Sequence, residues 1–342
     1  MQRRALIVVL MLAACCCAKG QVAGMSTLSV LDMPTSARTA ALGMDYLSLY
    51  DNDLGVAVNN PSFIDKRYHN QLMLSVANLF AGSNLASVSY GYHAGKMCDF
   101  VFSLHFNSYG RFEGYTAEET PAGKFFAADY SVGIGWGMHV DSVISIGASL
   151  KPTVSQYESY TALALAIDLA GSYVSRDKSL SATLIGRNAG AQFKTFDGMT
   201  EKLPFELSAA LSYQLKNAPF RLFLSATELQ HWNLGYDDEF NPTSQTDPFT
   251  GERKEQSSFA RALDNTGRHA IVGVELTIRQ VLMARVGFNY RRSKETKGTT
   301  NINTSGFSYG LGVKMRRLHM DVGRNNYNLG KAANYITLRV DL

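Results

Sequence analysis

Residues 269–291 read HAIVGVELTI, RQ and VLMARVGFNYR, two runs in which every second residue is apolar, joined by a short link. In the first run Glu275 and Thr277 sit between apolar neighbours, and in the second Arg285 does. Because successive side chains of a β-strand point to opposite faces, each run predicts a strand with one apolar and one polar face. The dipeptide Arg279-Gln280 predicts a tight turn between them.

The same alternation recurs through the rest of the chain. It predicts about fourteen strands after residue 70, an even number as closed antiparallel barrels of bacterial type require. The strands are expected to begin near Leu72, Leu85, Phe100, Phe125, Val143, Thr161, Leu180, Phe205, Phe220, His269, Val281, Phe307, Leu318 and Tyr335. From the third strand onward, tight turns alternate with longer links. The longer links lie around 116–124, 188–204, 230–266 and 293–300. Outer-membrane barrels have short periplasmic turns and longer external loops in this way.

The N-terminus carries an export signal, because Arg3 and Arg4 precede an apolar run over 5–14. This run is too short to span a membrane, and no later apolar segment reaches the roughly eighteen residues needed. Charged residues make up 18% of the chain, below the roughly 25% of ordinary globular proteins. Together with the loop pattern, this favours a transmembrane antiparallel β-barrel over a soluble all-β protein. We therefore expect it in the outer membrane of a Gram-negative bacterium, with loops at the cell surface.

Three parts are expected: a signal peptide over 1–20, an N-terminal hatch segment over 21–70 and the barrel over 71–342. The segment Leu12 to Cys15 resembles a lipoprotein processing site, whereas Ala18-Lys19-Gly20 suits ordinary cleavage, so lipidation of Cys15 stays open. The hatch segment does not alternate, and Thr35-Ser36 offers a helix start. It fits either a plug inside the barrel or a helical cap on the periplasmic side.

Neither the charge balance nor the motifs predict an enzyme or a nucleic-acid-binding protein. Without Arg3, Arg4 and Lys19, 30 basic residues face 29 acidic ones. There is no nucleophile elbow, zinc-protease motif or phosphate loop, and Cys98 is the sole cysteine after the signal. We expect no catalytic residue, cofactor or metal. Glu275 and Arg285 lie on adjacent strands facing inward, so they predict an ion pair in the lumen.

The longest loop mixes aromatic and charged residues, as binding hot spots do. The partner-binding candidates are Trp232, Tyr236, Asp237, Asp238, Phe240, Phe249 and Arg253. Trp232 and Tyr236 also fit the aromatic girdle at the membrane surface. Asp237-Asp238-Glu239 offers oxygen atoms but lacks the ligand spacing of a calcium loop.

The N-terminal sequence resembles the PorQ family of the type IX secretion system. The resemblance rests on LDMPTSARTAALG over 31–43, DNDL over 51–54, Asn60-Pro61, LFAG over 79–82, NSYGRF over 107–112 and AADYS over 127–131. Its hatch motif comprises Pro34, Ser36, Ala37, Arg38, Ala41, Leu42, Gly43, Asn60 and Pro61. The chain departs from the family at Met44, where a second glycine is usual, and at Ser62, where alanine is usual. PorV and the FadL-like transport barrels share parts of this pattern.

The resemblance implies a 14-stranded FadL-like barrel with an accessory role at the cell surface. PorQ-type barrels are associated with PorZ, the sortase PorU and PorV in an attachment complex. That complex removes the C-terminal signal of secreted cargo and joins the cargo to anionic lipopolysaccharide. The expected partners are therefore outer-membrane lipid or lipopolysaccharide, PorZ, PorU and PorV.

Two functions follow as hypotheses. The first is a non-catalytic anchor that holds surface partners to the membrane. The alternative is a FadL-like transporter of hydrophobic small molecules, which needs an apolar cavity and a lateral gap in the wall. The predicted lumen is polar, which favours the anchor, but Gly133, Gly135 and Gly137 predict a strand kink that a gap requires.

Overall fold

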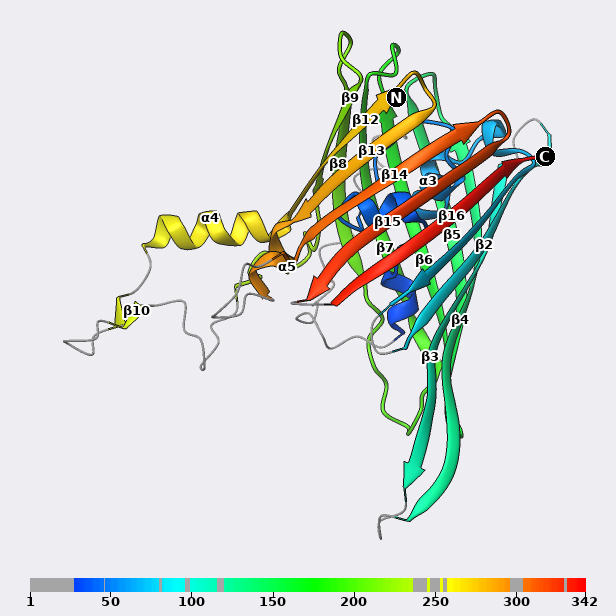
Figure 1. Ribbon diagram of the computed structural model, residues 1–342, viewed down its shortest axis with the longest axis vertical. Helices are drawn as coiled ribbons and strands as arrows, with labels where there is room; N and C mark the ends of the chain where they lie inside the picture. The colour runs from blue at the N-terminus through cyan, green and yellow to red at the C-terminus, as the bar shows by residue number, and fades with distance from the viewer. Residues whose placement is uncertain are drawn as a thin grey trace, which may run out of the picture.

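The computed structural model describes residues 28–45, 47–79, 82–95, 99–115, 120–235, 245–246, 253–254, 257–295, 304–328 and 331–342. Fourteen antiparallel strands close into one barrel in the order β1-β16-β15-β14-β13-β12-β9-β8-β7-β6-β5-β4-β3-β2 (Figure 1). The predicted fourteen-stranded antiparallel barrel is therefore confirmed. Among the described residues, no helix is both long and apolar enough to cross a membrane.

The wall strands differ in length, and those of the β3–β4 hairpin are the longest. Their bounds are β1 Gln71–Asn78, β2 Asn84–His93, β3 Asp99–Tyr115, β4 Pro121–His139, β5 Ile144–Tyr157, β6 Tyr160–Val174, β7 Leu180–Lys194, β8 Glu206–Gln214, β9 Phe220–Ala226, β12 Ala270–Ile278, β13 Leu282–Asn289, β14 Phe307–Met315, β15 Leu318–Asn328 and β16 Lys331–Asp341. A separate two-stranded sheet joins β10 Gln245–Thr246 to β11 Arg253–Lys254.

The predicted strand starts agree with the observed ones to within a few residues. For two strands the predicted start lies later in the sequence than the observed one. β4 begins at Pro121 rather than near Phe125, and β16 begins at Lys331 rather than near Tyr335. In β4 the missed residues include Gly123 and Lys124, which break the apolar alternation but still pair with β3. Pairing with a neighbouring strand therefore extends the strand past the point where the hydrophobic pattern stops.

The side chains divide by register, as a membrane-spanning wall requires. In β5, Ile144 and Ile146 are 44% and 38% exposed on the outer face, whereas Ser145, on the inner face, is 3% exposed. Exposed apolar side chains recur on the other strands, including Leu104, Leu169, Leu211, Val272 and Val322. This outward apolar surface suits hydrocarbon, and the inward surface is polar.

The N-terminal segment contacts the inner face of the wall on several sides. It consists of η1 Ser29–Asp32, α2 Ala37–Ala41, α3 Leu54–Asn59, η2 Pro61–Phe63 and η3 Lys66–Tyr68. The Ala37 amide donates to Thr337 Oγ1 of β16 at 2.8 Å, and Ser225 of β9 donates to the Asp45 carbonyl at 2.8 Å. The described residues of 28–70 thus contact the inner face of the wall, as Figure 1 shows.

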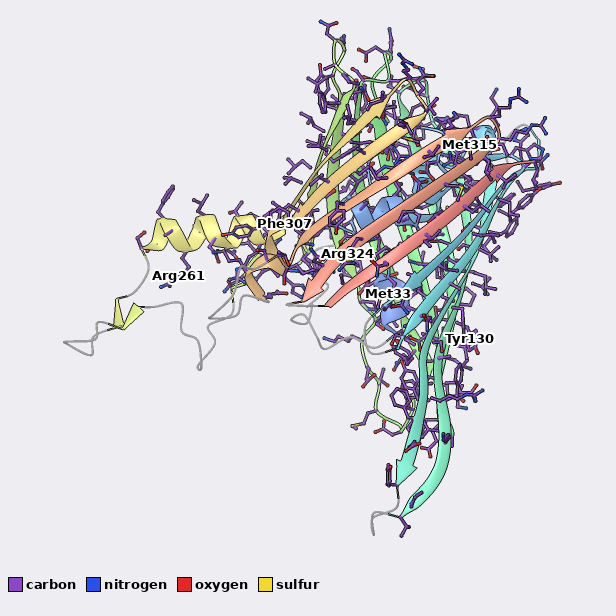
Figure 2. The ribbon with its side chains drawn as sticks, viewed as in Figure 1. Met33, Tyr130, Arg261, Phe307, Met315 and Arg324 are labelled. Carbon is purple, nitrogen blue, oxygen red and sulfur yellow. The ribbon has the colours of Figure 1, made fainter. Side chains whose placement is uncertain are left out.

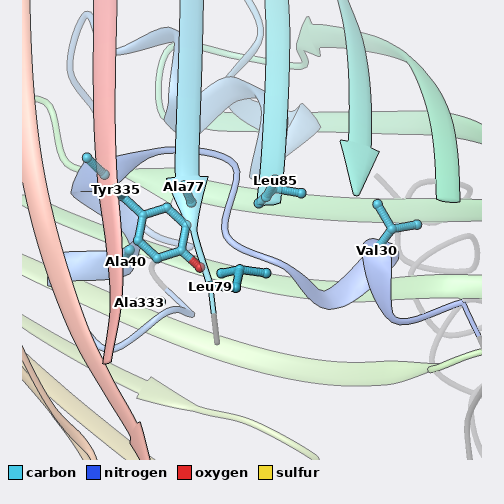
Figure 3. Close-up of a cluster of buried hydrophobic side chains, with 8 residues drawn as sticks. Val30, Ala40, Ala77, Leu79, Leu85, Ala333 and Tyr335 are labelled. Atoms are coloured by element: carbon cyan, nitrogen blue, oxygen red, sulfur yellow. The ribbon is translucent and has the colours of Figure 1, made fainter. Parts of the chain in front are cut away.

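Small apolar residues let this segment pack closely on one part of the wall. Figure 3 shows the cluster, which combines η1, α2 and strands β1, β2 and β16. Its members are Val30, Ala37, Ala40, Ala77, Leu79, Leu85, Ala333 and Tyr335. An alanine face brings the helix backbone near the strands, so this cluster supplies part of a core that the polar wall cannot form alone.

Glycines in the wall allow even closer contact. A Cβ atom on Gly147 of β5 would lie 2.2 Å from the Pro61 carbonyl oxygen, and one on Gly323 of β15 would lie 2.3 Å from that of Ala37. Gly137 is similar, because its Cβ would lie 2.5 Å from the Ile64 carbonyl oxygen. Gly137 also stays paired with Asp99 of β3, so the position serves close packing within a continuous ladder.

Two helices at the long-loop end were not predicted. α4 Ser258–His269 lies where a loop was expected, and α5 Tyr290–Glu295 replaces the expected end of a strand. Ser257 accepts from the Ala260 amide at 3.3 Å, and Asn289 accepts from the Arg292 amide at 3.1 Å. These polar side chains satisfy free amides of the first helical turn and so begin each helix locally.

Replacing Gly147 with alanine tests whether the wall glycines admit the N-terminal segment. The added methyl would overlap the Pro61 carbonyl, so we expect G147A to lower the free energy of unfolding by about 1–3 kcal/mol. Urea unfolding in lipid vesicles, followed by fluorescence, measures the change. Gly171 on the neighbouring strand β6 is the matched control, because a Cβ there meets nothing within 4 Å. Equal stability of G147A and G171A would contradict the close-packing role.

Candidate functional site

The helix α2 carries Arg38, which pairs with three carboxylates inside the barrel. Ser36 begins the helix by accepting from the Thr39 amide at 3.2 Å. Gly43 follows the helix with φ +93°, and a Cβ there would lie 2.4 Å from Ile271 Cγ2 of the wall. The sequence between these two residues therefore fixes where α2 starts and ends, and it places Arg38 within the lumen.

Arg38 binds three carboxylates. Its Nε and Nη2 atoms donate to the two oxygens of Glu275 on β12 at 2.9 and 2.7 Å. Its Nη1 lies 2.8 Å from Asp53 Oδ2 and 2.7 Å from Asp51 Oδ2. The planar guanidinium suits such fork-like pairing, which fixes both distance and orientation. Arg38 therefore joins two parts of the N-terminal segment to the barrel wall.

The contacts continue around the wall. Arg285 Nε lies 2.6 Å from Glu275 Oε2, and the same guanidinium also binds Asp321 of β15. Arg339 of β16 lies 2.7 Å from Asp53 Oδ1. We call the connected set the lumen ion network: Arg38, Asp51, Asp53, Arg221, Glu275, Arg285, Asp321 and Arg339. Four arginines face four carboxylates, so the network is neutral overall.

Asp53 shows how strongly the network holds its charges. Burial by itself raises the pKa of this carboxyl, but the positive charges of Arg339 and Arg38 outweigh that effect. The pKa of Asp53 in the folded protein therefore lies well below its usual value of 3.8. The carboxylate stays ionised, and removing either arginine would leave a buried negative charge with fewer partners.

A second junction is built around Asn60, on the other side of the N-terminal segment. Its Nδ2 donates to the Leu47 carbonyl at 2.7 Å and to Thr183 Oγ1 at 3.1 Å. Ser62 donates to Asn60 Oδ1 at 2.6 Å, and its hydroxyl lies 2.6 Å from that of Ser172. The serine that departs from the family pattern thus adds hydrogen bonds to the wall.

The other departure, Met44, adopts a backbone conformation that normally favours glycine. Its φ angle is +83°, directly after the positive φ of Gly43. The residue is buried, and its sulfur contacts Arg292 of α5. A methionine here accepts backbone strain and reaches the long-loop end of the barrel.

A bulge in β7 points a third polar group inward. Asn188 has φ +56°, and its amide donates to Asp168 Oδ1 at 2.8 Å where the β6–β7 register shifts. Lys151 also binds Asp168, at 2.8 Å, and Arg187 binds Asp45 and Glu206. Bulges re-aim side chains in this way.

The cavity beside this group is small and polar. Its volume is about 50 Å³, and its lining includes η1, Lys151, Asp168 and Arg187. Pockets for small apolar molecules usually reach about 300–1,000 Å³, so this one has room only for water. A hollow of about 670 Å³ lies at the short turns 177–179 and 214–219, on the surface and away from the lumen.

The sequence-predicted residues fall into three groups. The expected lumen pair, Glu275 and Arg285, lies at ion-pair distance. Hatch-motif residues including Ala37, Arg38 and Asn60 contact the wall. In the loop, Trp232 is exposed and stacks on His269 at 5.5 Å between ring centroids. Arg253 belongs to β11, which pairs only with β10. Tyr236, Asp237, Asp238, Phe240 and Phe249 lie outside the described residues, as do Cys98 and residues 1–27.

Sequence reasoning missed three members of the network. Asp321, Arg339 and Arg221 were not singled out, although each occupies the inward register of its strand. A charged residue that faces the inside of a barrel needs a partner of opposite charge. A charged residue in the inward register is therefore the sequence pattern that could have identified all three. Which partner each residue meets depends on the path of residues 28–70, which no strand alternation encodes.

Comparisons with known proteins identify the fold. No family model and no curated protein matches the sequence. Among solved structures, the P. putida toluene transporter TodX is 11% identical, with 91% of this chain and 99% of that chain covered and a TM-score of 0.52. CymD, a monoaromatic hydrocarbon channel, is 10% identical, with 93% and 99% covered and a TM-score of 0.52. At these identities the likeness establishes the fold alone, that of a closed antiparallel β-barrel.

Replacing Arg38 with methionine tests the lumen ion network. The variant leaves Glu275 and Asp53 buried with fewer positive partners, so we expect the free energy of unfolding to fall by about 3–5 kcal/mol. Urea unfolding measures the loss, and cleavage of residues 28–70 by added protease should become faster. Arg324→Met is the control, because Arg324 is exposed and donates to Asn334 Oδ1 at 3.2 Å, and it should cost about 0–1 kcal/mol. Similar losses for both variants would show that Arg38 does not join the segment to the wall.

Acidification tests the low pKa of Asp53. A group whose pKa is lowered by folding contributes stability that is present above its unfolded pKa and lost as pH falls through the folded one. Wild-type protein should therefore exceed Asp53→Asn in stability by a constant margin above about pH 4, and the margin should shrink below the usual pKa of 3.8. Unfolding curves of both proteins between pH 7 and pH 2 measure the difference. A margin that grows on acidification would refute the pairing.

Proposed function

We propose that this protein is a non-catalytic outer-membrane anchor of the PorQ type, which holds surface partners of a type IX attachment complex to the membrane. The observation that carries the proposal is the lumen ion network, which fastens the N-terminal segment to strands β9, β12 and β16. Arg285 of β13 and Asp321 of β15 extend the network along the wall. The Asn60 junction fastens the segment to β6 and β7 as well. A filled barrel suits an anchor better than a channel.

The free-energy cost of displacing the N-terminal segment favours a barrel that stays filled, which we call the closed form. Moving the segment aside would separate Arg38 from Glu275 of β12, and Asp53 from Arg339 of β16, in a buried site, at a cost of about 3–5 kcal/mol. Each 1.4 kcal/mol is about tenfold in population, so an open form would be about 10²- to 4 × 10³-fold rarer than the closed one. A transporter that keeps this network intact would need a route around the segment.

The β3–β4 hairpin offers a partner surface beyond the barrel rim, where Figure 1 shows it projecting past the other strands. Phe112 and Phe125 stack at 5.3 Å between ring centroids, Tyr115 is exposed, and Lys124 lies 3.6 Å from Glu113. Within the described residues, pairing with β2 ends at Ser108. Open strand edges and exposed aromatic side chains are features that protein partners recognise.

The second candidate function is transport of hydrophobic small molecules, and the fold comparisons favour it over a type IX role. TodX and CymD are hydrocarbon channels, and no comparison names a type IX component. The wall also has a local irregularity: β4 and β5 pair up to Ser131 and again from Ile134, but not at Val132 and Gly133. Pro152, opposite Val132, has no amide hydrogen to donate. A lateral route would have to pass at this point.

Two measurements separate the functions. For the anchor, replacing Phe112, Tyr115 and Phe126 with serine should release PorZ or PorU from outer membranes while the barrel still inserts. Tyr160→Ser is the matched control, because Tyr160 is also exposed at the same rim. Retention of both partners by the triple variant would argue against the hairpin as the anchoring surface. Retention also by a variant lacking the whole barrel would exclude the anchor function.

For transport, purified protein in vesicles should not speed entry of a fluorescent fatty acid or of toluene. Faster entry through wild-type protein, abolished by a leucine at Gly133, would establish the alternative instead. The Gly171→Leu variant controls for a bulky residue elsewhere in the wall, because a Cβ at Gly171 meets nothing within 4 Å.

A further inference from the structure

Helix α4 extends sideways from the long-loop end of the barrel, at the foot of β12 (Figure 1). At 100° per residue, its sequence separates into two faces. Phe259, Ala262, Leu263 and Thr266 share one face, and Arg261, Asp264, Asn265 and Arg268 share the opposite one. The helix is therefore strongly amphipathic, although it belongs to a loop.

The polar face is fastened to the protein. Asp264 accepts from Arg268 Nε and from the Tyr290 hydroxyl, both at 2.8 Å, and Lys294 of α5 lies 3.6 Å away. Asn265 accepts from the Leu234 amide at 2.8 Å. These contacts hold the orientation of α4 about its own axis, so the direction of its apolar face is set by the structure.

The apolar face is turned outward. Phe259 is 77% exposed and Leu263 is 65% exposed. A helix surrounded by water usually buries its apolar face against the protein and exposes its polar face. In α4 the apolar face is exposed and the polar face contacts the protein. The barrel wall has the same arrangement, with apolar side chains outside and polar side chains inside.

The position of α4 identifies what the apolar face meets. The helix ends at His269, and Val272 of β12, three residues on, is 45% exposed on the lipid-facing side. Phe307 and Tyr309 of nearby β14 are also exposed on the outer wall. In Figure 2, Arg261 lies on the side of α4 away from the short turns. Phe259 and Leu263, each two residues from Arg261, lie on the opposite side and face the level of the lipid belt.

We propose that α4 is an interfacial helix that lies on the outer leaflet of the membrane spanned by its own barrel. Phe259 and Leu263 enter the boundary of the acyl chains, and Arg261 stays at the level of the phosphate groups. The apolar face thus continues the lipid-facing belt of the wall sideways. The helix would fix the height of the barrel in the membrane.

Tryptophan scanning in vesicles tests this placement. The parent protein carries Trp136→Phe and Trp232→Phe, so that each added tryptophan is the sole indole. Phe259→Trp, Leu263→Trp and, as the matched control, Arg261→Trp are then reconstituted in vesicles of phosphatidylcholine and phosphatidylglycerol. Quenching by brominated acyl chains reports contact with lipid, and quenching by aqueous iodide reports contact with water.

We expect emission from positions 259 and 263 to be shifted to the blue and quenched by brominated lipid more strongly than emission from position 261, with the order reversed for iodide. Stronger iodide quenching at 259 and 263 would place the face in water and overturn the proposal. Protection from both quenchers would show that protein, such as a second copy, covers the face, and would overturn it equally. Because these positions are exposed, heat-modifiable migration on gels should confirm that all three variants fold.

Discussion

Closure of the backbone hydrogen-bond ladder is the constraint on which the rest of this structure depends. Hydrocarbon offers no partner to an amide or a carbonyl, so a sheet can cross it only when no edge is left open. Here β1 pairs with β16 over Gln71 to Asn78, which joins the first wall strand to the last. Once the sheet is closed, its outer face must be apolar and its inner face is left to polar side chains.

That polar interior creates a second requirement. A fourteen-stranded barrel is too wide for its own inward side chains to fill, and inward charges such as Glu275 and Arg285 need partners. The N-terminal segment meets both needs, because Arg38 and Asp53 complete the ionic contacts and the alanine face of α2 packs on the wall. The interior is thus held by paired charges and small residues in place of a conventional hydrophobic core.

The outward placement of apolar side chains extends beyond the wall. At the rim, α4 turns Phe259 and Leu263 outward while its polar face binds α5. The β3–β4 hairpin, in contrast, carries stacked aromatic residues past the end of the other strands. We propose that α4 meets the membrane and that the hairpin meets a protein partner, which would give the rim separate surfaces for lipid and for protein.

The sequence by itself determined the strand number, the register of each face and the inward position of Glu275 and Arg285, because a period of two is local and survives without knowledge of neighbours. It also located the start of α2 at Thr35-Ser36. Only the tertiary structure decided that Arg38 meets Glu275, some 237 residues away, and that Gly147 admits Pro61. These contacts depend on how a non-repeating segment threads a closed sheet, and no short-range pattern records that path. For the helix α4, both sources contribute. The helical periodicity of its apolar residues is present in the sequence of residues 258–269, but contacts with α5 set the direction of its apolar face.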